Sequence, residues 1–268
     1  MYIHELKEWP NFNWNSDALS PLLDRVRKRL SALAEQLATL GFNEQLEAGL
    51  RILTEDVVRT SEIEGKMLEP AQVRSSIARK LGLPEAGVHK EDRDVEGIVA
   101  VVINATQKCH EPLTKERLWS WHAALFPTGY SELKKILVGT WRDDSEGPMQ
   151  VISGRAGNPF VHFEAPGHLR LPLEMEKFCT WFEEVQGLDP ILKAAVAHLY
   201  FVTIHPFADG NGRIARAIAD LALARADNMT QRYYSMSAQI VVERTEYYDT
   251  LEASQSATLD ITDCPLCQ

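Results

Sequence analysis

Apolar residues recur every three or four positions through most of this chain, the spacing that places them on one face of an α-helix. The first such stripe runs from Leu19 to Leu40, and Gly41 follows it as a typical helix-ending residue. The same spacing, or an almost wholly apolar segment, predicts further helices at residues 46–58, 71–80, 95–105, 114–125, 173–185, 191–203, 213–226 and 237–254. The pattern therefore predicts a mainly α fold.

One segment, residues 139–166, departs from the helical pattern. It is rich in glycine and proline, and two short β-prone runs, 149–153 and 160–163, flank a glycine-rich turn within it. Such an arrangement is typical of a β-hairpin. The residues alone favour an ordinary surface hairpin. The expected architecture is a helical bundle with one small β-hairpin.

Composition excludes several classes of protein. The 268 residues are 45% hydrophobic and 25% charged, as in ordinary globular proteins. No apolar run reaches the roughly 18 residues that a membrane helix needs, and the N-terminus lacks the apolar core of a signal peptide, so we expect a cytoplasmic protein with no membrane partner. With 28 Lys and Arg against 38 Asp and Glu, the net charge of −10 disfavours general binding of nucleic acid.

The four cysteines are expected to be reduced thiols, as is usual in a cytosolic chain. Cys264 and Cys267 form a CxxC pair near the C-terminus, but the sequence around them supplies no two further zinc ligands at suitable spacing. We therefore expect no metal at this pair.

The most informative segment is residues 205–216, with the sequence HPFADGNGRIAR, which lies between two predicted helices. Its glycines predict a tight turn, so Asn211 and Gly212 come at the N-terminus of the second helix. Free backbone N–H groups and the helix dipole favour an anion there. Gly210 and Gly212 also let a phosphate approach the backbone closely.

The charged residues of this segment suit a nucleotide. Arg213 and Arg216 lie one helical turn apart, and an arginine donates two parallel hydrogen bonds to a phosphate. Asp209 supplies an oxygen ligand of the kind that Mg²⁺ prefers. His205 has a side chain able to take up a proton near neutral pH. Together these residues predict a phosphate cradle with a metal ligand and a general base.

The segment matches at every specified position the signature of the Fic (filamentation induced by cAMP) family, His-x-Phe-x-Asp/Glu-Gly-Asn-Gly-Arg-x-x-Arg. Residues 121–126 and 139–142 resemble the family's helix and the approach to its flap hairpin, and residues 237–251 resemble the segment after its core. The resemblance implies a Fic-type helical bundle in which the hairpin is a flap that docks the target by strand pairing.

Fic proteins typically transfer AMP from ATP to a hydroxyl side chain of a target protein. The resemblance implies that His205 deprotonates the Ser, Thr or Tyr hydroxyl of the target, and that Asp209 binds Mg²⁺ between the α- and β-phosphates. The turn 210–212 would hold these phosphates, Arg213 would neutralise the leaving pyrophosphate, and Arg216 would reach toward the γ-phosphate.

A second motif of the family lies upstream. Residues 60–65, TSEIEG, resemble the inhibitory motif Ser/Thr-x-x-x-Glu-Gly/Asn. The resemblance implies that Glu64 pairs with Arg216 and blocks the productive position of the γ-phosphate. The alternative is local, because Ser61 and Glu64 also fit a capping box at the start of a helix. The apolar stripe before them favours a helix that ends here, with Gly65 just after it.

Several alternatives stay open. The same site could remove AMP from a modified protein, with Glu64 orienting a water molecule, or the chain could be a non-enzymatic module that binds nucleotide or a partner. A homodimer is also left open. His198 is expected to be a core residue, whereas Tyr247 and Tyr248 suit either the core or an adenine pocket.

Three regions are expected along the chain. Residues 1–108 form an N-terminal helical extension with the inhibitory motif, residues 109–228 form the Fic core with flap and catalytic motif, and residues 229–268 form a C-terminal helical segment that we expect to be truncated.

Overall fold

The computed structural model describes residues 1–83, 92–155, 158–185, 187–227, 232–256 and 258–262. Its helices are α1 (Ser16–Ala38), α2 (Phe42–Ile63), α3 (Pro70–Lys80), α4 (Arg93–Gln107), α5 (Lys115–Leu125), α6 (Leu171–Glu184), α7 (Pro190–Ile204), α8 (Asn211–Asp227), α9 (Met236–Val242) and α10 (Arg244–Ser254). Its strands are β1 (Tyr130–Ser131), β2 (Lys134–Lys135), β3 (Gln150–Arg155) and β4 (Asn158–Glu164). The predicted mainly α class is confirmed, while Cys264 and Cys267 lie outside the described residues.

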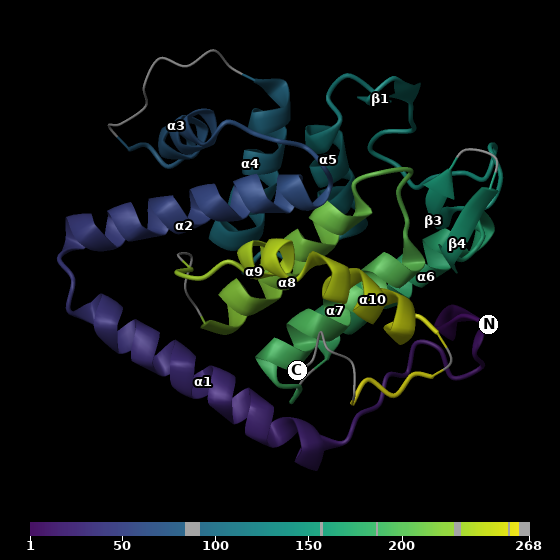
Figure 1. Ribbon diagram of the computed structural model, residues 1–268, viewed down its shortest axis with the longest axis horizontal. Coiled ribbons are helices and arrows are strands. Elements are labelled where there is room, and N and C mark those ends of the chain that lie inside the picture. The colour runs from purple at the N-terminus through teal and green to yellow at the C-terminus, as the bar shows by residue number, and fades with distance from the viewer. Residues whose placement is uncertain (84–91, 156–157, 186, 228–231, 257, 263–268) are drawn as a thin grey trace.

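Helices α7 and α8 run through the middle of the molecule and pack against each other (Figure 1). Almost every side chain of α7 from Leu192 to Ile204 is buried, as its apolar sequence requires. Helix α8 also packs against α4, and α2 packs against α3 and α9. This packing fixes the loop between α7 and α8, which carries the segment that the sequence singled out.

The N-terminal segment is tied to residues close to the end of the described chain. The Ile3 N–H donates to the Gln255 carbonyl at 3.0 Å, and the Asn13 N–H donates to the Leu259 carbonyl at 3.0 Å. One hydrophobic core includes residues from Ile3 to Leu259, so all three predicted regions contribute to it. The boundaries between those regions stay predictions.

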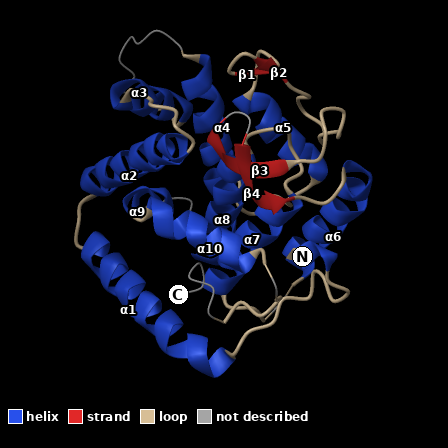
Figure 2. Ribbon diagram, turned by 45° about the vertical axis from the view of Figure 1, so that its right-hand side comes forward, coloured by secondary structure: helices blue, strands red, loops and turns tan. Residues whose placement is uncertain are grey.

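The structure also has two antiparallel hairpins, drawn in red in Figure 2. The expected hairpin consists of β3 and β4, and a bulge after Val151 leaves His162 as the extra residue of β4. The second, β1–β2, has strands of only two residues and was not predicted. The expected helix 237–254 is wrong in one respect, because Glu243 leaves the helical conformation and separates α9 from α10.

Within the described ranges, no helix combines the length and the apolar character needed to cross a membrane. The cytoplasmic location stays a prediction.

Candidate active site

His205 ends α7 in the left-handed conformation, with φ of 51°. Its N–H donates to the Phe201 carbonyl at 3.0 Å and so caps the helix, while its own backbone turns the chain into the loop before α8. The half-buried imidazole Nδ1 lies 3.1 Å from the carbonyl oxygen of Val202. This places the ring proton on Nδ1 and leaves the lone pair of Nε2 free to accept a proton.

The surroundings of His205 keep its ring neutral. Burial lowers its pKa to about 4, and the Arg142 cation acts in the same direction. The Val202 carbonyl and the carboxylates of Glu64 and Asp209 act in the opposite direction but are outweighed. At neutral pH the imidazole is therefore in the form that a general base requires.

Asp209 lies in the loop between His205 and α8. Its Oδ1 accepts from the Gly210 N–H at 2.5 Å, and its Oδ2 accepts from the Ser131 hydroxyl of β1. Among the described residues, no group of three or more His, Cys, Asp or Glu side chains could hold a metal ion by itself. A single carboxylate fits Mg²⁺ when phosphate oxygens and water complete its shell, so Asp209 suits that ion only together with a nucleotide.

The turn that begins α8 depends on two glycines and one asparagine. Gly210 has φ of 82°, and a Cβ there would lie 2.9 Å from the ring of Phe126. Asn211 braces the loop with both side-chain atoms, since Oδ1 accepts from the Phe207 N–H at 3.0 Å and Nδ2 donates to the Phe207 carbonyl at 2.8 Å. These two bonds fix the loop around Phe207, and the backbone N–H groups at the start of α8 are available to an anion.

Glu64 occupies this helix N-terminus. Its Oε1 accepts from Nη2 of Arg216 at 2.7 Å, and it lies so close to Gly212 that any Cβ there would overlap it. Arg216 also donates from Nε to the Thr60 hydroxyl at 2.8 Å and from Nη2 to the Thr60 carbonyl at 3.0 Å. Burial by itself lowers the pKa of Arg216, but the Glu64 carboxylate raises it above its ordinary value. The structure thus brings Glu64 and Arg216 together, as the resemblance implied, and it adds Thr60, whose contact with Arg216 was not predicted.

Glu64 lies at the end of a helix and not at its start. Gly65 has φ of 77°, its N–H donates to the Glu62 carbonyl at 2.9 Å, and the Lys66 N–H donates to the Ser61 carbonyl at 2.9 Å. These two bonds form a Schellman motif. The capping-box alternative is therefore wrong, since Ser61 lies in the last turn of α2.

Arg213 is a buried cation with spare hydrogen-bonding capacity. Its guanidinium lies 5.1 Å from the ring centroid of Phe126, and its Nε has no hydrogen-bond partner among the described residues. Lys66 approaches the same ring, with Nζ 5.9 Å from the centroid. A buried guanidinium with an unpaired N–H is the kind of group that an anionic ligand satisfies.

Three residues at the site were missed by the motif analysis. Ser131 bonds to Asp209, Arg142 donates to the His205 carbonyl at 2.8 Å, and His122 stacks on Phe207 with ring centroids 4.2 Å apart. Arg142 and His122 lie in segments that resemble the family. That resemblance indicates that the segments belong near the site, but it does not indicate what the two side chains contact. The sequence offers no comparable signal for Ser131.

The predictions for His198, Tyr247 and Tyr248 concern whether each side chain is buried in the core. His198 is buried, as expected, and its Nε2 lies 3.0 Å from the Tyr247 hydroxyl. Burial lowers the pKa of His198 to about 3 and raises that of Tyr247 to about 12, so both are neutral core groups. Tyr248 is exposed, and its place in an adenine pocket stays a prediction.

Comparison with known proteins places this geometry in a family. Residues 112–223 match the model described as the Fic/DOC family. This part of the chain is a Fic domain. Residues 2–83 match a second model, described as a domain of unknown function (DUF4172).

Two curated relatives cover most of the chain. Protein adenylyltransferase fic-1 of Caenorhabditis briggsae is 25% identical over an alignment 261 residues long, which covers 91% of this chain and 47% of the relative. Protein adenylyltransferase Fic of Culex quinquefasciatus is 27% identical over an alignment 253 residues long, which covers 89% of this chain and 46% of the relative. The chain thus spans about half the length of these relatives.

Solved structures share the fold. A Fic family protein from Desulfovibrio desulfuricans G20 superposes with a TM-score of 0.63 at 23% identity, covering 93% of this chain and 68% of the other. A Fic domain containing signaling protein from Bacteroides thetaiotaomicron VPI-5482 gives a TM-score of 0.64 at 20% identity, covering 88% and 85%. At these identities the likeness shows the fold, which is the Fic-type helical bundle.

Proposed function

We propose that this Fic protein is a protein adenylyltransferase that transfers AMP from ATP to a Ser, Thr or Tyr hydroxyl of a target protein and is held at low activity by Glu64. The observation that carries the proposal is the arrangement around the start of α8. A neutral histidine whose Nε2 can accept a proton lies on the loop that leads to a helix N-terminus, where Arg213 is buried with an N–H that has no partner among the described residues. The adenylyltransferase names of the relatives support the same reaction.

In the proposed reaction, the target hydroxyl oxygen attacks the α-phosphorus of ATP. A new P–O bond forms, the bond from the α-phosphorus to the oxygen bridging it to the β-phosphate breaks, and pyrophosphate leaves. Nε2 of His205 takes the hydroxyl proton, while Arg213 and the N–H groups at the start of α8 stabilise the charge on the phosphates. Mg²⁺ held by Asp209 would neutralise part of that charge and hold the phosphates in place.

Glu64 would inhibit by occupying the place of a phosphate. Its carboxylate is bound by the guanidinium of Arg216 at the helix N-terminus, and both of these groups favour a phosphate for the same reasons. The γ-phosphate and the Glu64 carboxylate therefore compete for Arg216. Removal of the carboxylate should free the site.

The flap is the proposed docking element for the target. The β3 and β4 strands pair only with each other within the described part of the chain, and Val151, Ile152 and Phe160 are exposed. A hairpin with a free edge can accept an extended segment of another protein by strand pairing. The target would then present its hydroxyl from this added strand.

The test compares Glu64→Gly with the wild-type protein after incubation with ATP and Mg²⁺. Intact-mass and peptide mass spectrometry should detect AMP on the protein or on an added acceptor in Glu64→Gly, little in wild type, and none in Glu64→Gly/His205→Ala. Glu62→Gly is the matched control, because Glu62 lies two residues before Glu64, in the last turn of α2, and bonds to Arg59 instead of Arg216. Equal and negligible labelling of wild type and Glu64→Gly would contradict the proposal.

The same proteins separate the alternatives. Release of AMP from a pre-adenylylated acceptor by wild type, lost in Glu64→Gly, would indicate the reverse reaction with Glu64 orienting water. Binding of ATP without any turnover in each variant would indicate a non-enzymatic nucleotide-binding module.

A further inference from the structure

Arg142 lies in the segment between α5 and the flap, and its side chain is almost wholly buried, with 1% exposed. Its Nε donates to the His205 carbonyl at 2.8 Å, and its backbone N–H donates to the Pro206 carbonyl at 2.9 Å. One residue thus bonds to two consecutive carbonyls of the loop that begins with the candidate base.

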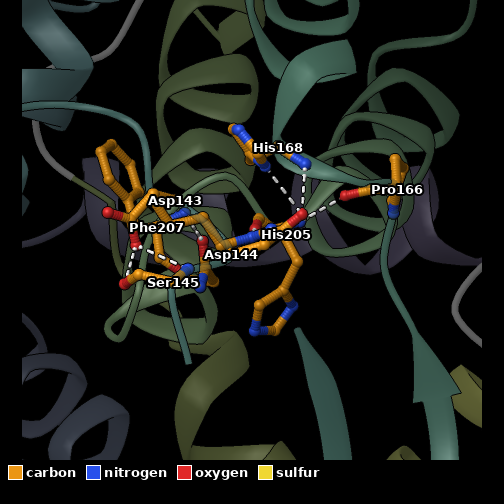
Figure 3. Close-up of polar contacts among 9 residues, drawn as sticks. Asp143, Asp144, Ser145, Pro166, His168, His205 and Phe207 are labelled. Carbon is orange, nitrogen blue, oxygen red and sulfur yellow. Dashed lines mark hydrogen bonds and ion pairs between the residues drawn. The ribbon is translucent and has the colours of Figure 1, made fainter. Parts of the chain in front are cut away.

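The other side of the same guanidinium holds the flap. Nη1 donates to Oδ1 of Asp144 at 2.6 Å, six residues before β3, and Nη2 donates to the Pro166 carbonyl at 2.5 Å, two residues after β4. Oδ2 of Asp144 in turn accepts from the His168 N–H at 2.8 Å and lies 2.9 Å from His168 Nδ1. Figure 3 shows Asp144, Pro166 and His168 gathered near the backbone of His205, whose ring projects away from them.

This arrangement bears on the conformation of His205. A positive φ is disfavoured for a residue with a Cβ, so the surrounding structure must hold His205 at 51°. The bonds from Arg142 to the His205 and Pro206 carbonyls act on the two peptide units that follow the His205 Cα. A guanidinium can donate in three directions from one rigid plane, which the ammonium of a lysine on its flexible stem does not reproduce.

We propose that Arg142 is a positioning residue that fixes the candidate base and both ends of the flap in one frame, so that a hydroxyl presented by the flap meets Nε2 of His205. Only the meeting of the hydroxyl with Nε2 rests on the proposed function. Arg142 itself contacts neither the phosphate site at the start of α8 nor Arg213 and Arg216, so its role concerns the acceptor and the base. Binding of the nucleotide is expected to be independent of it.

The kinetic test uses Arg142→Lys and Arg142→Gln in the Glu64→Gly background. We expect kcat for AMP transfer to fall about tenfold or more in both variants, because small displacements of reacting groups cost that much, while the Kd for ATP changes less than about twofold. A kcat within about threefold of the Glu64→Gly parent in Arg142→Lys would overturn the proposal. So would a loss of ATP affinity equal to the loss of kcat.

The matched control is Arg117→Lys in the same background. Arg117 is also buried and also donates to main-chain carbonyls, but these belong to residues at the end of α4 and after it, namely Asn104, Lys108 and Glu111. Its variant should lose thermal stability and keep kcat. A loss of kcat in Arg117→Lys equal to that in Arg142→Lys would show that any buried arginine has the same effect and would overturn the positioning role.

A second readout does not depend on AMP transfer. Hydrogen exchange measured by mass spectrometry should be faster in β3, β4 and the loop 205–210 of Arg142→Gln, and unchanged there in Arg117→Gln. Unchanged exchange in Arg142→Gln would overturn the proposal. If no protein transfers AMP, the proposed function fails, while this exchange experiment still decides whether Arg142 joins the flap to the loop.

Discussion

The stacked pair of His122 and Phe207 makes a quantitative prediction about stability and pH. His122 lies on α5 with no exposed surface, its Nδ1 accepts from the Gly139 N–H at 3.2 Å, and its ring is nearly parallel to that of Phe207, at 8°. Burial lowers its pKa to about 4, from 6.5 for the free side chain. The folded protein therefore holds His122 neutral at pH values where the unfolded chain protonates it.

Proton linkage gives the sign and the size of the change in the free energy of unfolding with pH. Between pH 6.5 and 4 the unfolded state binds a proton at His122 that the folded state does not, so the free energy of unfolding decreases as the pH falls through this window. For these two pKa values the loss is about 2 kcal/mol at pH 5 and reaches about 3 kcal/mol below pH 4. Above pH 6.5 both states are neutral and the contribution is constant.

His122→Gln removes this titration and keeps a polar side chain of similar length. We expect urea unfolding to show that the wild-type protein loses about 2 kcal/mol more between pH 7 and pH 5 than His122→Gln does. Other buried histidines, such as His198, titrate alike in both proteins and cancel in the difference. Substitution by Gln of His110, an exposed histidine outside the stacked pair, is the control for the loss of a histidine. Equal losses in wild type and His122→Gln would show that His122 is not held neutral in the folded protein.

Three further outcomes are expected. Gly97→Ala should lower the free energy of unfolding by about 1–3 kcal/mol, because the added Cβ overlaps the Ala124 carbonyl oxygen where α4 meets α5; an unchanged thermal midpoint would contradict this. His162→Gln should speed hydrogen exchange in β3 and β4, since it disrupts the 2.6 Å contact between His162 and Glu252 that ties the flap to α10, and exchange equal to wild type would argue against such a tie. AMP transfer by the uninhibited enzyme should be flat from pH 6 to 8 and fall at lower pH as His205, with its pKa of about 4, becomes protonated; a decline that begins near pH 7 would show that His205 is not held neutral.

The helices could be predicted because their signal is local. Each buried face recurs along its own segment with helical spacing, and the structure follows that spacing even where the ends differ by a few residues. The break between α9 and α10 could not be predicted, because Glu243 is neither glycine nor proline. After it, Arg244 donates to the Ile63 carbonyl at 2.7 Å, a contact with a residue 181 positions earlier that no local pattern reveals.

The β1–β2 hairpin was missed for a related reason. Its second strand consists of Lys134 and Lys135, both exposed, and lysine is depleted in strands. The hairpin is nevertheless part of the site, since Ser131 bonds to Asp209. Strands of two residues contain too little sequence for a pattern, so only the folded chain reveals them.

In the candidate site, too, the local features could be predicted and the tertiary contacts could not. Residues 205–216 are contiguous, so their spacing was enough to predict a turn followed by a helix N-terminus, and the structure has both. The meeting of Glu64 with Arg216 came from a resemblance and not from spacing. The role of Arg142 was not predicted at all, since its bonds to His205 and to the two ends of the flap depend on tertiary packing.

The proposed inhibition acts at the level of one side chain. The end of α2 is held by main-chain bonds of Gly65 and Lys66 and by Arg244 on the Ile63 carbonyl, and none of these involves the Glu64 carboxylate. Thr60 holds Arg216 through two further bonds, so the guanidinium stays in place whether its third partner is Glu64 or a phosphate. The Glu64 side chain is 31% exposed while that of Arg216 is 2% exposed, so the carboxylate has room to move where the arginine has none.

Exchange of the carboxylate for a phosphate therefore requires rotation of the Glu64 side chain and no unfolding of α2. The inhibition then equals the fraction of molecules in which Glu64 occupies the site, and a phosphate that binds Arg216 reduces that fraction by simple competition. A partner that favoured another rotamer of Glu64 would relieve the proposed inhibition, at far less cost in free energy than melting a helix. We therefore expect hydrogen exchange along α2 to be the same in the inhibited protein and in Glu64→Gln, because the two differ in the charge at the site and not in the helix that carries it.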